Sequence, residues 1–158
     1  MHRVQLKKQL SVGLPDELDL TFQEIEDFRP GEPVICCWEQ DDLHFIIDAD
    51  DQPGGMAPEE YWMSLESCLR KDAGYTNVRT LKAGSYTSDA GEQITYRIYQ
   101  CDSGLESEHQ VYHLISNAEI AYWILSTLRG LEDIFLVNAH VTRIARTALL
   151  TEASGNER

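Results

Sequence analysis

The chain has 158 residues, 42% of them hydrophobic, which is enough for one domain with its own core. Its 27 acidic and 13 basic residues give a formal net charge of −14. Nucleic acid and anionic membrane surfaces would repel such a chain, so we expect neither as a partner. No run approaches the roughly 20 apolar residues of a membrane span, and MHRVQLKKQLSVG at the start lacks the apolar core of a signal peptide. We therefore expect a cytoplasmic protein.

The first half of the chain is predicted to form three strands and a helix. ELDLTFQ at 17–23 alternates between polar and apolar side chains, as a half-buried strand does. VICCW at 34–38 and LHFIIDA at 43–49 are predicted to pair across the turn EQDD. A helix is predicted over 58–72, because it opens with proline and carries an apolar stripe at helical spacing.

The second half is predicted to form four strands and a second helix. The strands are predicted at 76–84, 92–101, 108–116 and 119–127, and the helix at 131–149. In the strand at 119–127 the side chains of both faces are apolar, which is typical of a strand in the middle of a sheet covered on both faces.

The predicted order is β-β-β-α-β-β-β-β-α. Short turns between successive strands predict antiparallel pairing, and the two helices can cover opposite faces. The expected fold class is α+β: an α/β/α sandwich with a mostly antiparallel sheet of about six or seven strands and two main helices. We expect a single domain over residues 1–150 and a disordered tail over 151–158.

IIDADDQPGGMAPEEYW, at 46–62, packs acids around two glycines and raises the question of a calcium loop. Counting from Asp48, Glu59 falls at position 12 of such a loop, but position 6 is Pro53 instead of glycine. Proline cannot adopt the backbone angle that position 6 requires. We interpret the stretch as a strand that ends near Ala49, a solvated acidic turn and a helix start; a weak cation site is the alternative.

The sequence contains no nucleophile elbow, P-loop, dinucleotide fingerprint or zinc-helix motif. His109 and His113 are predicted to lie on a strand, roughly 13 Å apart, which is too far to share one metal ion. GSYTSDAG at 84–91 is interpreted as an exposed hairpin loop. We therefore expect no enzymatic activity, no cofactor and no metal.

The cysteines show no C-x-x-C spacing, which argues against a structural zinc site. We interpret them as reduced, buried or half-buried apolar residues. They are Cys36, Cys37, Cys68 and Cys101.

Aromatic side chains are the remaining candidates for binding, since tryptophan and tyrosine are enriched at interfaces as well as in cores. A core position is the favoured interpretation for each tryptophan, because each lies at helical or strand spacing. The candidate partner-binding residues are Trp38, Trp62, Tyr99 and Trp123.

The layout of the chain resembles a known fold. PEEYWMSLESCLRKDAGYTNVRTL is similar to the first helix and following strand of the PsbP/Mog1-like fold. GEQITYRIYQCDSGLESEHQVYHLISNAEIAYWILST resembles its three antiparallel strands, and FLVNAHVTRIARTALL its closing helix. The resemblance covers about residues 43–149. SVGLPDELDLTFQ resembles the strand that opens many members, without the tryptophan that often follows it.

Within that superfamily the chain looks most like the bacterial branch of DcrB-like proteins and the Eag chaperones of type VI secretion. The resemblance implies an α/β/α sandwich without a catalytic site and a role in binding other proteins. Eag chaperones shield apolar transmembrane segments of secreted effectors. The resemblance carries over no functional residue.

We expect a non-enzymatic, cytosolic bacterial protein that binds another protein, as a secretion-associated chaperone or accessory factor. Its partner would be an apolar effector segment, or a basic protein such as a toxin that an acidic inhibitor neutralises. A homodimer is left open. The alternative is a small-ligand-binding protein or a hydrolase, with a pocket between sheet and helix lined by Tyr99 and Trp123.

Overall fold

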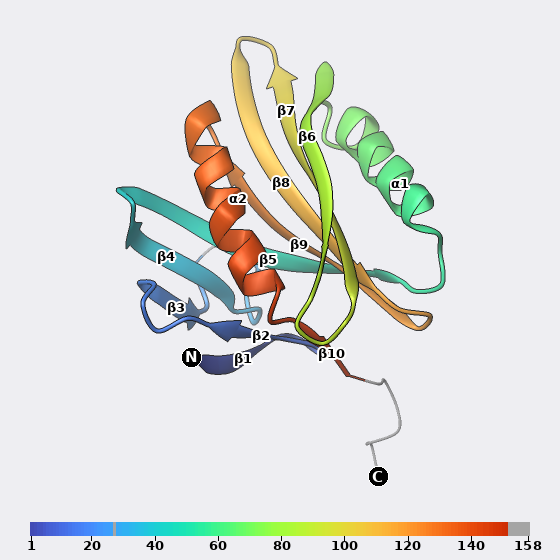
Figure 1. The fold of residues 1–158 in the computed structure, drawn as a ribbon. Coiled ribbons are helices and arrows are strands. Elements are labelled where there is room, and N and C mark those ends of the chain that lie inside the picture. The colour runs from blue at the N-terminus through green and yellow to red at the C-terminus, as the bar shows by residue number, and fades with distance from the viewer. Residues whose placement is uncertain (27, 152–158) are drawn as a thin grey trace.

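The computed structural model describes residues 1–26 and 28–151. It confirms the predicted α+β class: seven antiparallel strands form one large sheet, with two helices and a small three-stranded sheet (Figure 1). In chain order the elements are β1 (His2–Lys7), β2 (Leu10–Leu14), β3 (Leu20–Gln23), β4 (Val34–Gln40), β5 (Leu43–Pro53), α1 (Pro58–Lys71), β6 (Asn77–Thr87), β7 (Gln93–Ser103), β8 (Glu106–Ser116), β9 (Ile120–Leu128), α2 (Leu131–Ala145) and β10 (Leu149–Leu150).

The large sheet has the strand order β3-β4-β5-β9-β8-β7-β6, so β9 is its central strand. Five of the nine β9 residues, Ile120 to Ile124, are consecutive and buried. The apolar character of both faces of β9 correctly predicted this central position.

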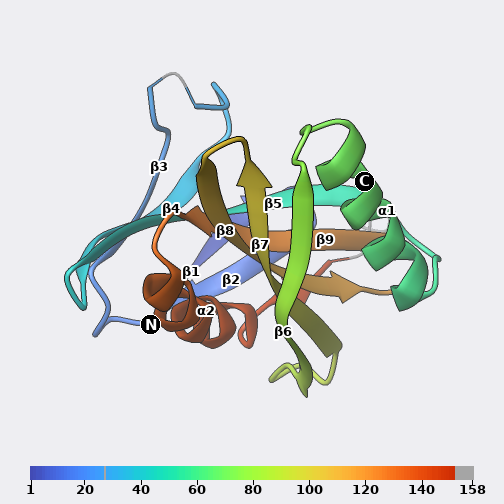
Figure 2. The same cartoon turned by 90° about the horizontal axis from the view of Figure 1, so that it is seen from above.

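The two helices cover opposite faces of the large sheet, as predicted (Figures 1 and 2). Side chains alternate along β8: Val111 and Ile115 belong to the core under α2, whereas Tyr112 and Leu114 belong to the core under α1. Neither helix has the length and apolar character needed to cross a membrane, within the described residues.

The small sheet was not predicted. It has the order β1-β2-β10, and β2 is buried along its whole length. Leu10 and Val12 of β2 join the core under α2. Basic residues hide the alternation of β1, and β10 has only two residues, so neither gives a clear periodic pattern.

Two predicted boundaries are wrong, and a third is not tested. The strand predicted over 17–23 begins only at Leu20, because Leu18 N–H closes a turn on the Pro15 carbonyl. The second helix ends at Ala145 rather than near 149, where the chain forms β10 instead. The expected tail over 151–158 lies outside the described residues except for Thr151.

The hairpin loop predicted over 84–91 is present but shorter than predicted, because β6 continues through Thr87 and the turn begins at Ser88. Within β6, Tyr86 is half-buried and its hydroxyl bonds to His113. The cysteine interpretation holds for Cys36, Cys37 and Cys101, which are buried, but Cys68 is exposed on α1. All four are free thiols.

The acidic stretch differs from the predicted turn. The strand does not end near Ala49: β5 runs to Pro53, and Asp48 to Pro53 pair with Leu125 to Ile120 of β9. Proline is tolerated because this end of β5 has a free edge, where its missing N–H breaks no ladder. The turn begins at Gly54, whose backbone passes so close to Glu119 that an added Cβ would lie 2.2 Å from the Glu119 carbonyl carbon. Pro58 opens α1 as predicted.

Candidate binding face on the large sheet

The second half of β5 is paired on one side only. The ladder between β4 and β5 runs from Gln40↔Leu43 to Ile35↔Ile47, and beyond Ile47 only β9 pairs with β5 among the described strands. Asp48, Asp50 and Asp51 therefore lie along a free strand edge. Charged side chains on such an edge prevent unwanted pairing with other strands, which is the ordinary structural role of these acids.

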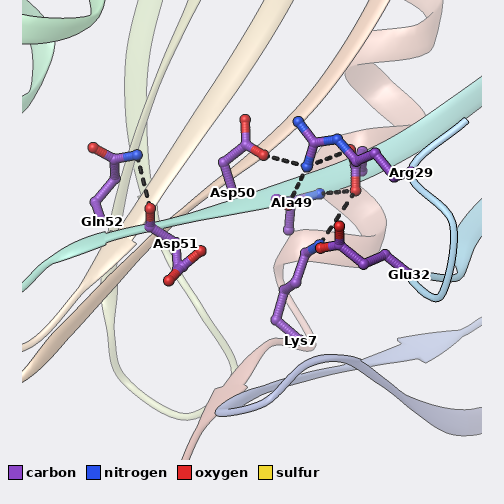
Figure 3. Close-up of polar contacts among 8 residues, drawn as sticks. Lys7, Arg29, Glu32, Ala49, Asp50, Asp51 and Gln52 are labelled. Carbon is purple, nitrogen blue, oxygen red and sulfur yellow. Dashed lines mark hydrogen bonds and ion pairs between the residues drawn. The ribbon is translucent and has the colours of Figure 1, made fainter.

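Side chains from two other segments cover this edge (Figure 3). Arg29, in the loop before β4, places Nη1 3.0 Å from Asp48 Oδ2 and also bonds to the Asp50 carboxylate. Lys7 of β1 donates to Glu32 over 2.9 Å and lies 3.9 Å from Asp48 Oδ1. The five groups carry a net charge of −1, so the cluster leaves the edge acidic.

Asp48 is the most unusual member of this cluster, since only 4% of it is exposed. Burial raises the pKa of its carboxyl, because the charged form loses hydration. The Ala49 N–H, which donates to Oδ1 over 2.7 Å, and the guanidinium of Arg29 oppose that shift. Arg29 therefore compensates a buried charge, and it does so with a positive φ of 45°, a conformation uncommon outside glycine.

Next to Arg29 the sheet surface is hollowed and apolar. A hollow of about 340 Å³ lies over β5 and β9, and Ile46 and Leu125 on its floor are half-buried. Phe28, 37% exposed, forms one wall. The remaining lining residues are Arg29, Asp48, Ser126 and Thr127.

The hollow is open because α1 does not reach it. The buried core under α1 takes its sheet residues from β6, β7, β8 and the first half of β9 as far as Trp123, and the half-buried Leu125 packs against its margin. Beyond that point the same face continues over β9, β5 and β4 without a helix. We call this surface the open face and define it by Trp38, His44, Ile46, Asp48, Leu125 and Thr127.

Of the predicted partner-binding residues, Trp38 alone lies on the open face. It is 39% exposed, its ring lies 4.8 Å from that of His44, and its Nε1 donates to Thr21 over 3.0 Å. A second hollow of about 290 Å³ lies beside Trp38 and His44.

The other three candidates come together beneath α1. Trp62, Tyr99 and Trp123 are at most 4% exposed. The Trp62 ring lies 4.7 Å from Trp123 and 6.4 Å from Tyr99. Glu66 of α1 accepts a hydrogen bond from the Tyr99 hydroxyl over 2.8 Å. These rings occupy the space between α1 and the sheet, where the ligand-binding alternative placed its pocket.

The histidines of β8 serve separate contacts. His109 Nδ1 lies 2.8 Å from the Arg129 carbonyl, and His113 bonds to Tyr86 and Asn138. Within residues 1–26 and 28–151, no group of three His, Cys, Asp or Glu is placed to hold a metal ion.

Sequence reasoning missed Phe28, Arg29 and Lys7. MHRVQLKKQLSVG was considered only as a possible signal peptide, and no site was predicted in the loop before β4. No local pattern relates Arg29 to Asp48, because their proximity depends on how the loop before β4 crosses the free edge of β5.

No protein-family model matches the sequence, and no curated protein matches it. Solved structures similar to this protein include the following two. Cyanobacterial PsbP (CyanoP) from Synechocystis sp. PCC 6803 has a TM-score of 0.59 at 13% identity, covering 94% of this chain and 91% of that one. LpqN of Mycobacterium tuberculosis, involved in cell envelope biogenesis, has a TM-score of 0.57 at 11% identity, covering 96% and 91%. The protein described here therefore has a PsbP-like fold.

Proposed function

We propose that this chain is a non-enzymatic protein-binding domain whose partner docks on the open face. The observation that carries the proposal is the apolar hollow of Phe28, Ile46 and Leu125 beside the carboxylates of Asp48 and Asp50, on sheet surface that α1 leaves uncovered. An exposed apolar surface bordered by charge is typical of a protein-binding site.

The charge of the surface defines the partner. A chain of net charge −14 attracts basic partners and repels acidic ones. We infer a partner segment that combines an apolar side chain for the hollow with a lysine or arginine for the half-exposed carboxylate of Asp50, since Asp48 is buried.

Within the PsbP-like fold we place the chain, as a proposal, in the bacterial DcrB-like and Eag-chaperone branch. Its role would be that of a cytoplasmic, secretion-associated chaperone or accessory factor. The layout resemblance and the open apolar hollow support this role, and the acidity would keep such a chaperone soluble while it holds an apolar client.

The test is capture of partners from the native cell lysate by the tagged protein, with Phe28→Ser beside the wild type. Met63→Ser is the matched control, because Met63 is 72% exposed on α1, away from the open face. We expect one stoichiometric partner that wild type and Met63→Ser retain and Phe28→Ser loses at least about tenfold.

Salt then separates the two kinds of partner. A basic partner should be lost at high salt and an apolar client retained, because salt screens exposed charges but does not weaken apolar contacts. Absence of any partner at both salts, or capture indifferent to Phe28→Ser, would contradict the proposal. A small molecule that raises the melting temperature of wild type but not of Phe28→Ser would favour the ligand-binding alternative instead.

A further inference from the structure

The solvent side of α2 is unusually apolar for an acidic protein. Leu131, Phe135 and Leu136 are 47%, 41% and 39% exposed. They make up three of the nine exposed large hydrophobic side chains in the described residues, and they fall within the first six residues of one helix. The helix needs none of them for its own packing, because Ile134, Val137, Val141 and Ile144 bury its other side.

On this outer side of α2, charged side chains of opposite sign lie at opposite ends of the helix. A residue every three or four positions lies on one helix face, and the face opposite the buried side contains Glu132, Phe135, Leu136, Ala139 and Arg143. We call these five residues the α2 stripe. It has an acid at its N-terminal end, apolar residues in the middle and a base at its C-terminal end.

Such an order is complementary to itself when two helices run antiparallel. If the two α2 helices cross between residues 137 and 138 of each copy, Glu132 of one copy lies opposite Arg143 of the second copy. Leu136 lies opposite the second copy's Ala139, so a large side chain meets a small one at each central contact. The two-fold relation makes every contact occur twice and closes the assembly at two chains.

We propose that the α2 stripe is a docking surface for a second copy of this chain, in an antiparallel, two-fold pair. In Figure 1 α2 lies in front of the large sheet with no other helix on its outer side, so a second helix can approach it. Arg143 also contacts Glu17 of its own chain, yet 45% of its side chain is exposed and its guanidinium has further donors for a second carboxylate.

The pairing is weak at low salt. Each chain carries −14, and the mutual repulsion of two such bodies opposes the two Glu132–Arg143 pairs. Salt screens the long-range repulsion more than it affects the apolar contacts, so association strengthens with ionic strength. This response is opposite to that of a basic partner on the same stripe.

The experiment is sedimentation of the full chain over a range of concentrations at low and at high salt. We expect the mass to rise from the 18.0 kDa of one chain toward twice that value, with a dissociation constant on the order of 10–100 μM, as suits a small interface. Phe135→Ser should weaken the pair at least about tenfold.

Charge exchange supplies the specific test. Glu132→Arg places like charges at both ends of the pair and should weaken it about tenfold or more, although it lowers the net repulsion. Glu132→Arg combined with Arg143→Glu should restore the wild-type constant to within about threefold. Glu59 is exposed on α1, away from the α2 stripe. Glu59→Arg makes the same change in net charge and should not weaken the pair.

A chain that stays monomeric at all concentrations and salts would overturn the proposal. So would a dimer that Phe135→Ser and Glu132→Arg leave unchanged, since its interface would lie elsewhere. Circular dichroism of each variant confirms that it is folded. The α2 stripe lies on the opposite side of the sheet from the open face, so dimerisation and partner capture can fail independently.

Discussion

His113 of β8 donates from Nε2 to the side-chain oxygen of Asn138 on α2 over 2.7 Å, with both side chains buried. Its Nδ1 accepts a hydrogen bond from the hydroxyl of Tyr86 over 2.7 Å, and its ring stacks on that of Tyr96 with 5.1 Å between the ring centroids. The imidazole is therefore neutral, with its proton on Nε2, and it ties α2 to the middle of the sheet.

This contact predicts loss of stability in mild acid. Burial lowers the pKa of His113 from 6.5 to about 4. The unfolded chain takes up a proton near pH 6.5, so the contribution of His113 is complete above that pH and is lost as the pH falls toward 4. The shift corresponds to roughly 3 kcal/mol at most.

Urea unfolding between pH 7.5 and 4 measures this effect. His113→Phe should be less stable at neutral pH and should show a shallower decline across the window. His44→Phe, at an exposed histidine, is the matched control. Equal slopes for His113→Phe and wild type would show that other groups cause the decline.

Arg29 is expected to stabilise the protein through Asp48. Arg29→Met leaves the buried carboxylate with the Ala49 N–H and, as its only nearby cation, the more distant Lys7, and we expect a loss of about 1–2 kcal/mol at pH 7. Adding Asp48→Asn should recover part of it, because the uncompensated charge is gone.

The measurement is chemical denaturation of the two single variants and the double variant. Arg79→Met is the control, since Arg79 is exposed and bonds to Gln100 at the edge of the sheet. If Arg29→Met and Arg79→Met cost the same, the ion pair with Asp48 contributes no more than an exposed side-chain contact.

Trp62 is predicted to hold α1 on the sheet. Trp62→Ala removes a ring that contacts Tyr99 and Trp123, and we expect a loss of about 3–5 kcal/mol in the free energy of unfolding. Its neighbour Met63 is exposed, so Met63→Ala should cost less than about 0.5 kcal/mol. Equal losses would mean that α1 packs by another route.

Gly54 is predicted to tolerate no side chain. An added Cβ would lie 2.2–2.5 Å from backbone atoms of Glu119 and Ile120, which cannot move as a flexible side chain could. Gly54→Ala should therefore cost about 1–3 kcal/mol in a thermal or urea melt. A neutral effect would show that the β5–α1 turn can shift away from the start of β9.

The central part of the fold was predictable because its pattern is local. Two apolar faces in one nine-residue segment placed β9 in the middle of a covered sheet, and the apolar stripe over 58–72 located α1. These signals arise from burial of residues close in sequence.

The open face was less predictable because it depends on contacts between distant segments. Trp38, Trp62, Tyr99 and Trp123 have the same chemistry, and only the path of α1 decides that three are buried and one is exposed. The end of β5 was predicted too early for a related reason. The residues of DDQP favour a turn, and only their pairing with the distant strand β9 makes them part of β5.

The pairing of β5 with β9 has a consequence for synthesis on the ribosome. β3, β4 and β5 leave the exit tunnel well before β9. These three strands therefore cannot join the rest of the sheet until β9 has been synthesised, because β9 is the strand that pairs with β5. During that interval the edge of β5 that will receive β9 is exposed, and a nascent chain with such an edge is prone to aggregation. Because the aspartates of β5 repel the same segment of neighbouring chains, we expect their negative charge to limit aggregation of the unfinished protein.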